Sequence, residues 1–204
     1  MRYVKWVVIV LFWCVVAAFL HYTLPQHDIA RITDTYERRV DPGNNSLFWS
    51  GASSGDNAAV TGRDVFFVQT RLADDEVMVY RNEDTGWGWP PFFKFDTANV
   101  QAEAADMRST SAAPEWVAIK HYGWRNELFS IYPNLLKVTP VAGPDARIIP
   151  WGNIIILTLL VAIAWAIWVR WRRFRRARID PMLGDMGDNF DNAGGRLRGM
   201  FRRS

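Results

Sequence analysis

Two long apolar blocks constrain this chain more than any other feature of its sequence. Residues 148–169 carry no charged side chain, and residues 6–20 are an unbroken apolar run. A helix needs about 20 apolar residues to cross the hydrocarbon core of a bilayer. The sequence therefore predicts transmembrane helices over residues 1–24 and 148–169, with residues 25–147 between them and a tail over residues 170–204.

The first block also has features of a secretory signal. Arg2 and Lys5 precede the apolar run, and the small residues Ala17 and Ala18 lie near its end. Apolar and aromatic residues nevertheless continue to Leu24, as they do at membrane interfaces. We interpret the block as an uncleaved helix, and a cleaved signal remains the alternative.

The charge distribution predicts how the chain is threaded. Residues 25–147 carry 12 Lys or Arg and 17 Asp or Glu, whereas six of the nine residues from Arg170 to Arg178 are Arg. Cationic flanks stay in the cytoplasm. We therefore expect a protein of the bacterial inner membrane, with both termini in the cytoplasm and the middle segment in the periplasm.

The arginine run itself suggests a lipid contact. Arginine clusters also bind nucleic acid, but here Trp171 and Phe174 alternate with the arginines directly after an apolar block. That arrangement favours anionic membrane lipid. The residues expected to contact lipid and to fix the topology are Arg170, Arg172, Arg173, Arg175, Arg176 and Arg178. The rest of the tail is Gly-rich, and we expect it to be largely disordered.

The middle segment is rich in strand signals. Runs of β-branched and aromatic residues predict strands, and they fall at residues 29–40, 65–71, 77–81, 115–125 and 128–140. Residues 43–62 are rich in Gly, Ser and Asn, which is typical of a flexible loop.

One short helix is expected near Ala98, capped by Asp96 or Thr97, because Val100 and Ala104 fall on one helical face. We predict a membrane-anchored, mainly β (α+β) fold, in which two transmembrane helices flank a small five-stranded barrel. A helix between the third and fourth strands is typical of oligonucleotide-binding barrels. The acidic middle segment nevertheless argues against nucleic acid as a partner.

Three blocks carry a family resemblance: HYTLPQHDIARI (21–32), YRNEDTGWGWPPFFKFDTANVQAEA (80–104) and KHYGWRNELFSIYPNLL (120–136). They resemble the signature blocks of the domain-of-unknown-function family 1523. The resemblance implies a two-span inner-membrane protein of alphaproteobacteria. It supplies no catalytic residues.

The residues that usually carry chemistry are few. His21, His27 and His121 lack the spacing of zinc ligands, and the one cysteine, Cys14, lies in the first apolar block. Nucleophile, phosphate-loop and dinucleotide motifs are absent from the sequence. We therefore expect no metal, no cofactor and no enzymatic activity, with an envelope enzyme as a remote alternative.

The stretch GWGWPPFFKF (86–95) is the most unusual part of the middle segment. Its aromatic residues suit either a plug in the barrel core or an exposed platform. We expect Phe93 and Phe95 to point inward and Trp87 and Trp89 to be partly exposed. The candidate contact surface comprises Trp87, Trp89, Tyr122 and Trp124.

These features predict an interaction or accessory module in the cell envelope. The expected partners are membrane lipids and another envelope protein or an envelope polymer. The alternative is a non-catalytic subunit of a larger membrane complex.

Overall fold

The computed structural model describes residues 2–40 and 63–181. The chain divides into two compact units, Met1–Pro150 and Trp151–Ser204, and each is described by itself. The predicted loop over residues 43–62 and the tail beyond residue 181 lie outside the described residues.

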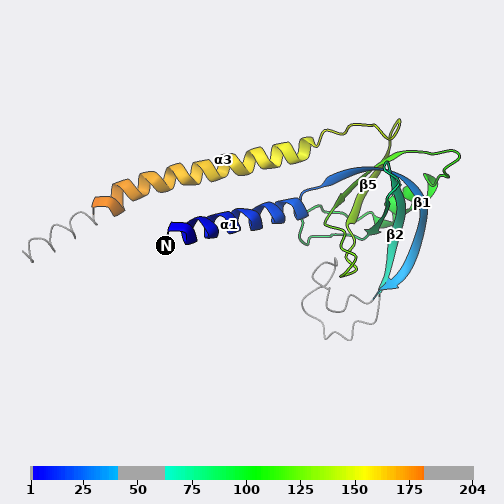
Figure 1. The fold of residues 1–204 in the computed structure, drawn as a ribbon, viewed down its shortest axis with the longest axis horizontal. Helices are drawn as coiled ribbons and strands as arrows, with labels where there is room; N and C mark the ends of the chain where they lie inside the picture. The colour runs from blue at the N-terminus through cyan, green and yellow to red at the C-terminus, as the bar shows by residue number, and fades with distance from the viewer. Residues whose placement is uncertain (1, 41–62, 182–204) are drawn as a thin grey trace, which may run out of the picture. The chain divides into compact units, whose positions relative to one another are not determined.

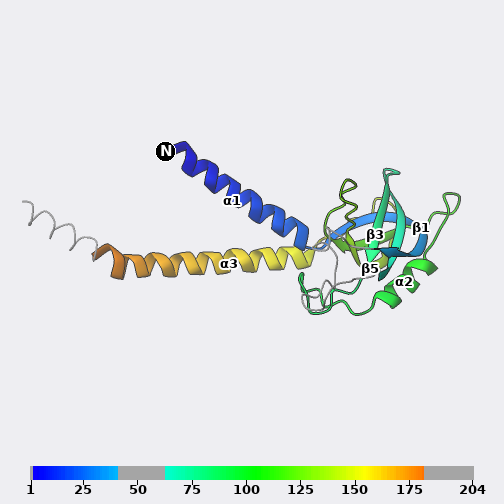
Figure 2. The ribbon, with the colours of Figure 1, turned by 90° about the horizontal axis from the view of Figure 1, so that it is seen from below.

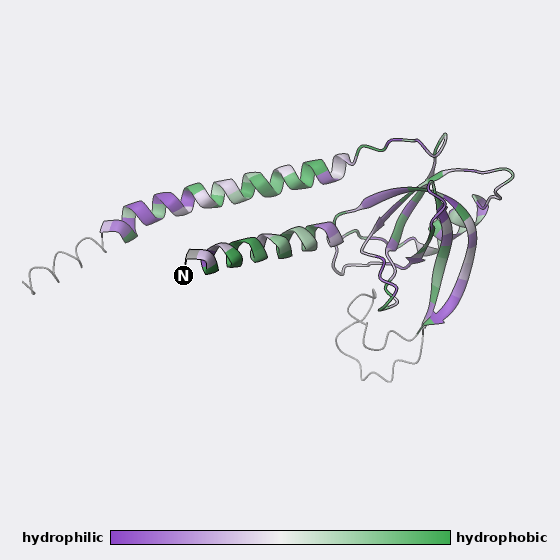
Figure 3. Cartoon of the chain, in the orientation of Figure 1, coloured by the Kyte–Doolittle hydropathy of each residue, from purple (hydrophilic) through white to green (hydrophobic). Residues whose placement is uncertain are grey.

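Two helices match the two apolar blocks. α1 covers Arg2–Thr23, and α3 covers Trp151–Phe174 and continues as the π-helix η2, Arg175–Ile179. Both are long and apolar enough to cross a membrane, and Figure 3 shows their apolar stretches in green.

The second helix differs from the prediction at both ends. It begins at Trp151 rather than at residue 148, because the residue before Pro150 is disfavoured from helical geometry. At its other end the helix continues through the arginine run to residue 181. Residues 170–181 are therefore helical, and the rest of the tail that was predicted to be largely disordered lies outside the described residues.

Between the helices the chain forms a closed barrel. Its strands are β1 (Gln26–Val40), β2 (Arg63–Leu72), β3 (Val77–Asn82), β4 (Val117–Tyr122) and β5 (Asn134–Pro140). They follow the order β1-β2-β3-β5-β4, and β3 pairs with β5 in parallel while the other pairs are antiparallel. Figures 1 and 2 show β1 continuing directly from α1. The predicted five-stranded barrel is confirmed, and its strand order is that of an oligonucleotide-binding barrel.

β1 is long enough to pair with two strands, β4 and β2, and these two pairings close the barrel. Its first part, Gln26 to Ala30, pairs with β4, and its later part, Ala30 to Val40, pairs with β2. The register shifts between Ile32 and Asp34, which marks a bulge. A bulge bends a strand and increases its twist, so β1 can pair with β4 along its first part and with β2 along its later part.

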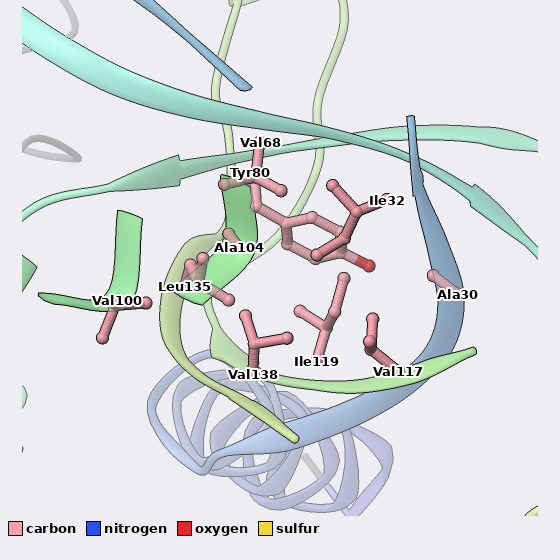
Figure 4. Close-up of a cluster of buried hydrophobic side chains, with 10 residues drawn as sticks. All are labelled: Ala30, Ile32, Val68, Tyr80, Val100, Ala104, Val117, Ile119, Leu135 and Val138. Carbon is pink, nitrogen blue, oxygen red and sulfur yellow. The ribbon is translucent and has the colours of Figure 1, made fainter. Parts of the chain in front are cut away.

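The core consists of inward-facing side chains from every strand and from α2 (Thr97–Asp106), as Figure 4 shows. Its buried members are Ala30, Ile32, Val68, Tyr80, Val100, Ala104, Val117, Ile119, Leu135 and Val138. The predicted helical face with Val100 and Ala104 is thus confirmed, and it covers part of the barrel interior.

The cap of α2 differs from the prediction. Asp96 occupies the N-cap position but makes no side-chain cap hydrogen bond. Instead, Asp84 Oδ1 accepts hydrogen bonds from the Thr97 backbone N at 3.0 Å and the Thr97 hydroxyl at 2.7 Å. A carboxylate that follows β3 therefore stabilises the start of α2 and ties the helix to the barrel.

The connection between β4 and β5 is longer than predicted. β4 ends at Tyr122 and β5 begins at Asn134. Gly123 has a positive φ of 91°, a conformation that glycine adopts readily, and it ends the strand. The intervening loop carries an isolated bridge between Asn126 and Ile131.

Candidate functional site

Two loops of the first unit, between β3 and α2 and between β4 and β5, expose large apolar side chains, and five of them form one group. We call them the aromatic surface: Trp87, Trp89, Phe93, Phe95 and Trp124. Trp87 is 84% exposed and Trp89 is 67% exposed, as expected from the sequence. The ring of Trp87 lies 5.3 Å from that of Phe93 and 6.0 Å from that of Phe95, measured between centroids. Trp87, Phe93 and Phe95 therefore pack on one another outside the barrel core.

The aromatic surface packs against the last turns of α1. Trp89 stacks on Phe19, with ring centroids 5.8 Å apart and an interplanar angle of 13°. Trp124 donates a hydrogen bond from Nε1 to His21 Nδ1 at 2.8 Å, and its ring meets Tyr22 edge-on at 5.4 Å. The two loops therefore meet α1 at the end from which β1 leaves.

Two expectations about this surface were wrong. Phe93 and Phe95 are 52% and 58% exposed rather than directed inward, because their segment is not a strand and has no inward–outward alternation. Tyr122 is only 2% exposed and packs against Phe92 and Tyr22. Tyr122 therefore supports the loops from inside and does not belong to the exposed surface.

A buried lysine lies at the base of the loop over residues 83–96, which joins β3 to α2 and which we call the aromatic loop. Lys94 is 5% exposed, and its ammonium group donates hydrogen bonds to Asn82 Oδ1 and to the Leu135 carbonyl, the latter at 2.7 Å. The Lys94 backbone N donates to the Thr85 hydroxyl at 3.1 Å, and the Gly86 N donates to the Lys94 carbonyl at 3.2 Å. These four hydrogen bonds therefore fix the conformation of the loop at its base.

The environment of Lys94 opposes its charge. Burial lowers the pKa of Lys94 to about 8, although Asp96, Asp84 and Glu83 act in the opposite direction. Uncompensated burial of an ammonium group is costly, so the two oxygen acceptors are essential to this arrangement. Nearby, Arg81 and Glu83 form a buried ion pair at 3.2 Å.

A second polar cluster lies in the barrel wall. The Tyr80 hydroxyl donates to Asp28 Oδ2 at 2.5 Å, and His121 Nε2 lies 2.9 Å from the same oxygen. Burial alone would raise the pKa of Asp28, but His121 and Tyr80 outweigh it and hold that pKa below its ordinary value. Burial, with Asp28 beside it, raises the pKa of Tyr80. Figure 4 shows the Tyr80 ring among the apolar core residues, so this cluster links β1, β3 and β4.

The predicted lipid-contacting arginines belong to the second unit. Arg170, Arg172 and Arg173 lie in the last turns of α3, and all are exposed. Arg175, Arg176 and Arg178 continue along η2. The Arg172 guanidinium lies 4.5 Å from the centre of the Trp168 ring, a cation–π contact.

Sequence reasoning missed Lys94 and Asp84. A single charge inside an otherwise aromatic and proline-rich run was the available signal for Lys94. No local signal exists for Asp84, because it caps a helix that begins 13 residues later.

Comparisons with known proteins agree with the resemblance. The family described as Protein of unknown function (DUF1523) matches residues 1–175. An uncharacterized protein of Haemophilus influenzae (strain KW20 / Rd) is 33% identical over 161 residues, covering 79% of this chain and 87% of the relative. No solved structure matches the chain. The alphaproteobacterial source stays a prediction, but the match over residues 1–175 shows that this chain belongs to the DUF1523 family.

Proposed function

We propose that this protein is a non-catalytic module of the bacterial cell envelope, whose barrel is held directly on the outer face of the inner membrane. The stacking of Trp89 on Phe19 carries this proposal. Phe19 lies four residues before the end of α1, or about 6 Å along the helix axis. An aromatic loop at that depth lies where Trp is enriched in membrane proteins, at the boundary between hydrocarbon and headgroups.

The contacts of α1 also favour a retained helix over a cleaved signal. His21 accepts a hydrogen bond from Trp124, and the Gln26 side chain donates to the His21 carbonyl at 2.8 Å. The Gly123 N donates to the Tyr22 carbonyl at 3.0 Å. Removal of α1 would leave the aromatic surface without these partners.

The charge distribution supports an orientation with both termini in the cytoplasm and the barrel in the periplasm. The arginines of α3 and η2 follow the second apolar block directly, and such flanks remain cytoplasmic. In this orientation the barrel wall away from the membrane is free to meet an envelope protein or polymer. The proposed role is therefore that of an interaction or accessory module.

Reporter fusions test this topology. A reporter that is active only outside the cytoplasm should be active after Gly143, which follows β5, and silent after Ser204. Replacing Arg170, Arg172 and Arg173 with Gln should weaken this orientation, because cationic residues near the helix end set it. Activity at both fusion sites would contradict two retained spans, and activity only after Ser204 would reverse the orientation.

A further inference from the structure

A shallow groove lies beside the aromatic loop, on β4, which pairs with β1, and on β5, which pairs with β4. Its volume is about 450 Å³, and its lining residues include Phe92, Phe93, Phe95, Lys120 and Lys137. β4 supplies Lys120 and β5 supplies Lys137. One side of the groove is thus aromatic and the other is cationic.

The two lysines oppose each other directly. Lys120 and Lys137 are cross-strand partners in the antiparallel register of β4 and β5, and like charges in that relation are destabilising. Across the other edge of β4, His27 is the partner of Lys120. Burial, and then the charge of Lys120, lowers the pKa of His27. A row of basic residues therefore crosses β1, β4 and β5.

The structure provides little compensation for these charges. Among residues 2–40 and 63–181, neither Lys120 nor Lys137 forms an ion pair. Asp96 is the carboxylate that lines the groove, and its side chain makes no cap hydrogen bond to α2. Two lysines facing one groove with one acidic neighbour form a site that favours an anion.

The backbone conformation that places the Phe93 ring beside these lysines is strained. Phe93 has a positive φ of 50°, which is unfavourable for a bulky residue. The residue that follows it, Lys94, is fixed by hydrogen bonds to Asn82 and Leu135. The buried lysine therefore holds Phe93 in a strained conformation with its ring exposed at the edge of the groove.

The groove lies close to the end of α1. Lys120 is opposite His27, four residues after Thr23, where α1 ends. Four extended residues span about 13 Å at most. The headgroup region adds about 5–8 Å to each side of the hydrocarbon core. The upper limit of about 13 Å exceeds the depth of the headgroup layer, so the long lysine side chains have to extend toward the membrane to meet lipid phosphates.

We propose that this groove binds the headgroup of an anionic phospholipid, with Lys120 and Lys137 on the phosphate and Phe93 and Phe95 against the apolar part of the lipid. The proposal rests on the proposed membrane seating of the barrel. It adds a binding site to that account and assigns its ligand class.

Titration of the full-length protein in neutral detergent tests the proposal. The probes are dihexanoyl phosphatidylglycerol, dihexanoyl phosphatidylcholine and inorganic phosphate, with binding followed by the thermal shift and by native mass spectrometry. Lys120→Gln and Lys137→Gln should each weaken phosphatidylglycerol binding about fivefold, from about 1 kcal/mol per basic residue near a lipid surface. The double variant should weaken it further.

Matched controls isolate the groove. Arg71→Gln with Arg108→Gln removes the same charge from the barrel outside the groove and should bind as the parent does. The arginines of α3 and η2 also attract anionic lipid, so the measured quantity is the difference between the two double variants. Asp96→Asn removes the acidic neighbour of the lysines and should tighten binding.

Three outcomes would overturn the proposal. They are absence of phosphatidylglycerol binding, equal binding by the two double variants, and phosphate or phosphatidylcholine binding as tight as phosphatidylglycerol binding. The last outcome would assign the groove to a free phosphate or to any phospholipid. None of them would affect the reporter result, so failure of the lipid site is distinguishable from failure of the proposed topology.

Discussion

The base and the tip of the aromatic loop have opposite environments, although only a few residues separate them. The base, formed by Asn82, Thr85 and Lys94, is buried and makes hydrogen bonds within the loop and to α2 and β5. The tip carries Trp87 and Trp89, which are mostly exposed. Polar residues thus hold the loop from inside, and apolar residues are presented outside, which reverses the usual distribution.

This reversal has a physical reason. A loop that exposes apolar rings gains little from burial, so its conformation must be fixed by hydrogen bonds at its base. Asn82 illustrates the point, since its amide donates to the Thr97 carbonyl and to Gln101 Oε1, both at 3.0 Å. The same residue accepts from Lys94. One side chain therefore joins β3, the loop and α2.

The largest expected loss of stability follows from removing the hydrogen bonds of Lys94 at the base of the aromatic loop. Lys94→Met keeps most of the side-chain volume but leaves two buried acceptors, on Asn82 and Leu135, without their donor. Each such group costs about 1–3 kcal/mol, so we expect a loss of about 2–6 kcal/mol in the free energy of unfolding. Denaturant unfolding of the full-length protein in detergent measures it. Lys137→Met, at an exposed position, should cause no loss of stability, because it removes the like charge opposite Lys120.

The lowered pKa of Lys94 predicts that the free energy of unfolding changes with pH in the alkaline range. Its folded pKa of about 8 lies below the ordinary value of 10.5, so the unfolded chain binds the proton more tightly. Stability should therefore rise as the pH increases from about 8 toward 10. Above that range Tyr80 and Tyr122, whose pKa values are raised, lose their contribution as the unfolded chain ionises. Lys94→Met should lack the rise between pH 8 and 10, and a rise of the same size in the variant would contradict the assignment.

A smaller effect is expected in the barrel wall, away from the loop. Tyr80→Phe removes the hydrogen bond to Asp28, which should cost about 1.5–3 kcal/mol at neutral pH because the acceptor is charged. The folded pKa of Asp28 is below its ordinary value of 3.8, so its contribution is present above that pH and is lost as the pH falls through the folded pKa. The difference between parent and variant should shrink in acid. A difference that stays constant to low pH would exclude an ionised Asp28 as the acceptor.

The smallest effect on stability is expected at the tip. Trp87→Ala combined with Trp89→Ala should change the melting temperature of the detergent-solubilised protein by only a few degrees, because both rings are mostly exposed. Ile119→Ala, at a fully buried position, should cost about 2–5 kcal/mol and is the control. Unfolding of the Trp variant to the same extent as the Ile119 variant would place the tip in the core.

The sequence predicted elements whose signals are local. The alternation along residues 29–40 and the β-rich runs on either side of residues 73–76 predicted β1 and the β2–β3 hairpin, and the structure confirms both. The face of α2 with Val100 and Ala104 was equally clear. In each case a period of 2 or 3.6 residues is imposed by burial on one side.

The residues that fix the loop could not be predicted in the same way. Lys94 is buried only because Asn82 and the Leu135 carbonyl, 12 and 41 residues away, converge on it. Phe93 and Phe95 were expected to alternate with a strand, but the positive φ of Phe93 interrupts any such pattern. The opposition of Lys120 and Lys137 depends on the register of β4 and β5, which includes a bulge next to Lys120. Tertiary pairing, not local pattern, creates these sites.

The seating of the tip in the membrane interface is tested most directly by site-directed spin labelling of the full-length protein in lipid bilayers. With the single cysteine replaced by Cys14→Ala, a nitroxide is placed at Trp87→Cys and, in a matched variant, at Asp74→Cys on the β2–β3 turn. We expect the label at position 87 to be relaxed more strongly by oxygen, which partitions into lipid, than by a water-soluble nickel chelate. The label at position 74 should show the reverse. Equal, water-like accessibility at both positions would contradict the membrane-seated barrel.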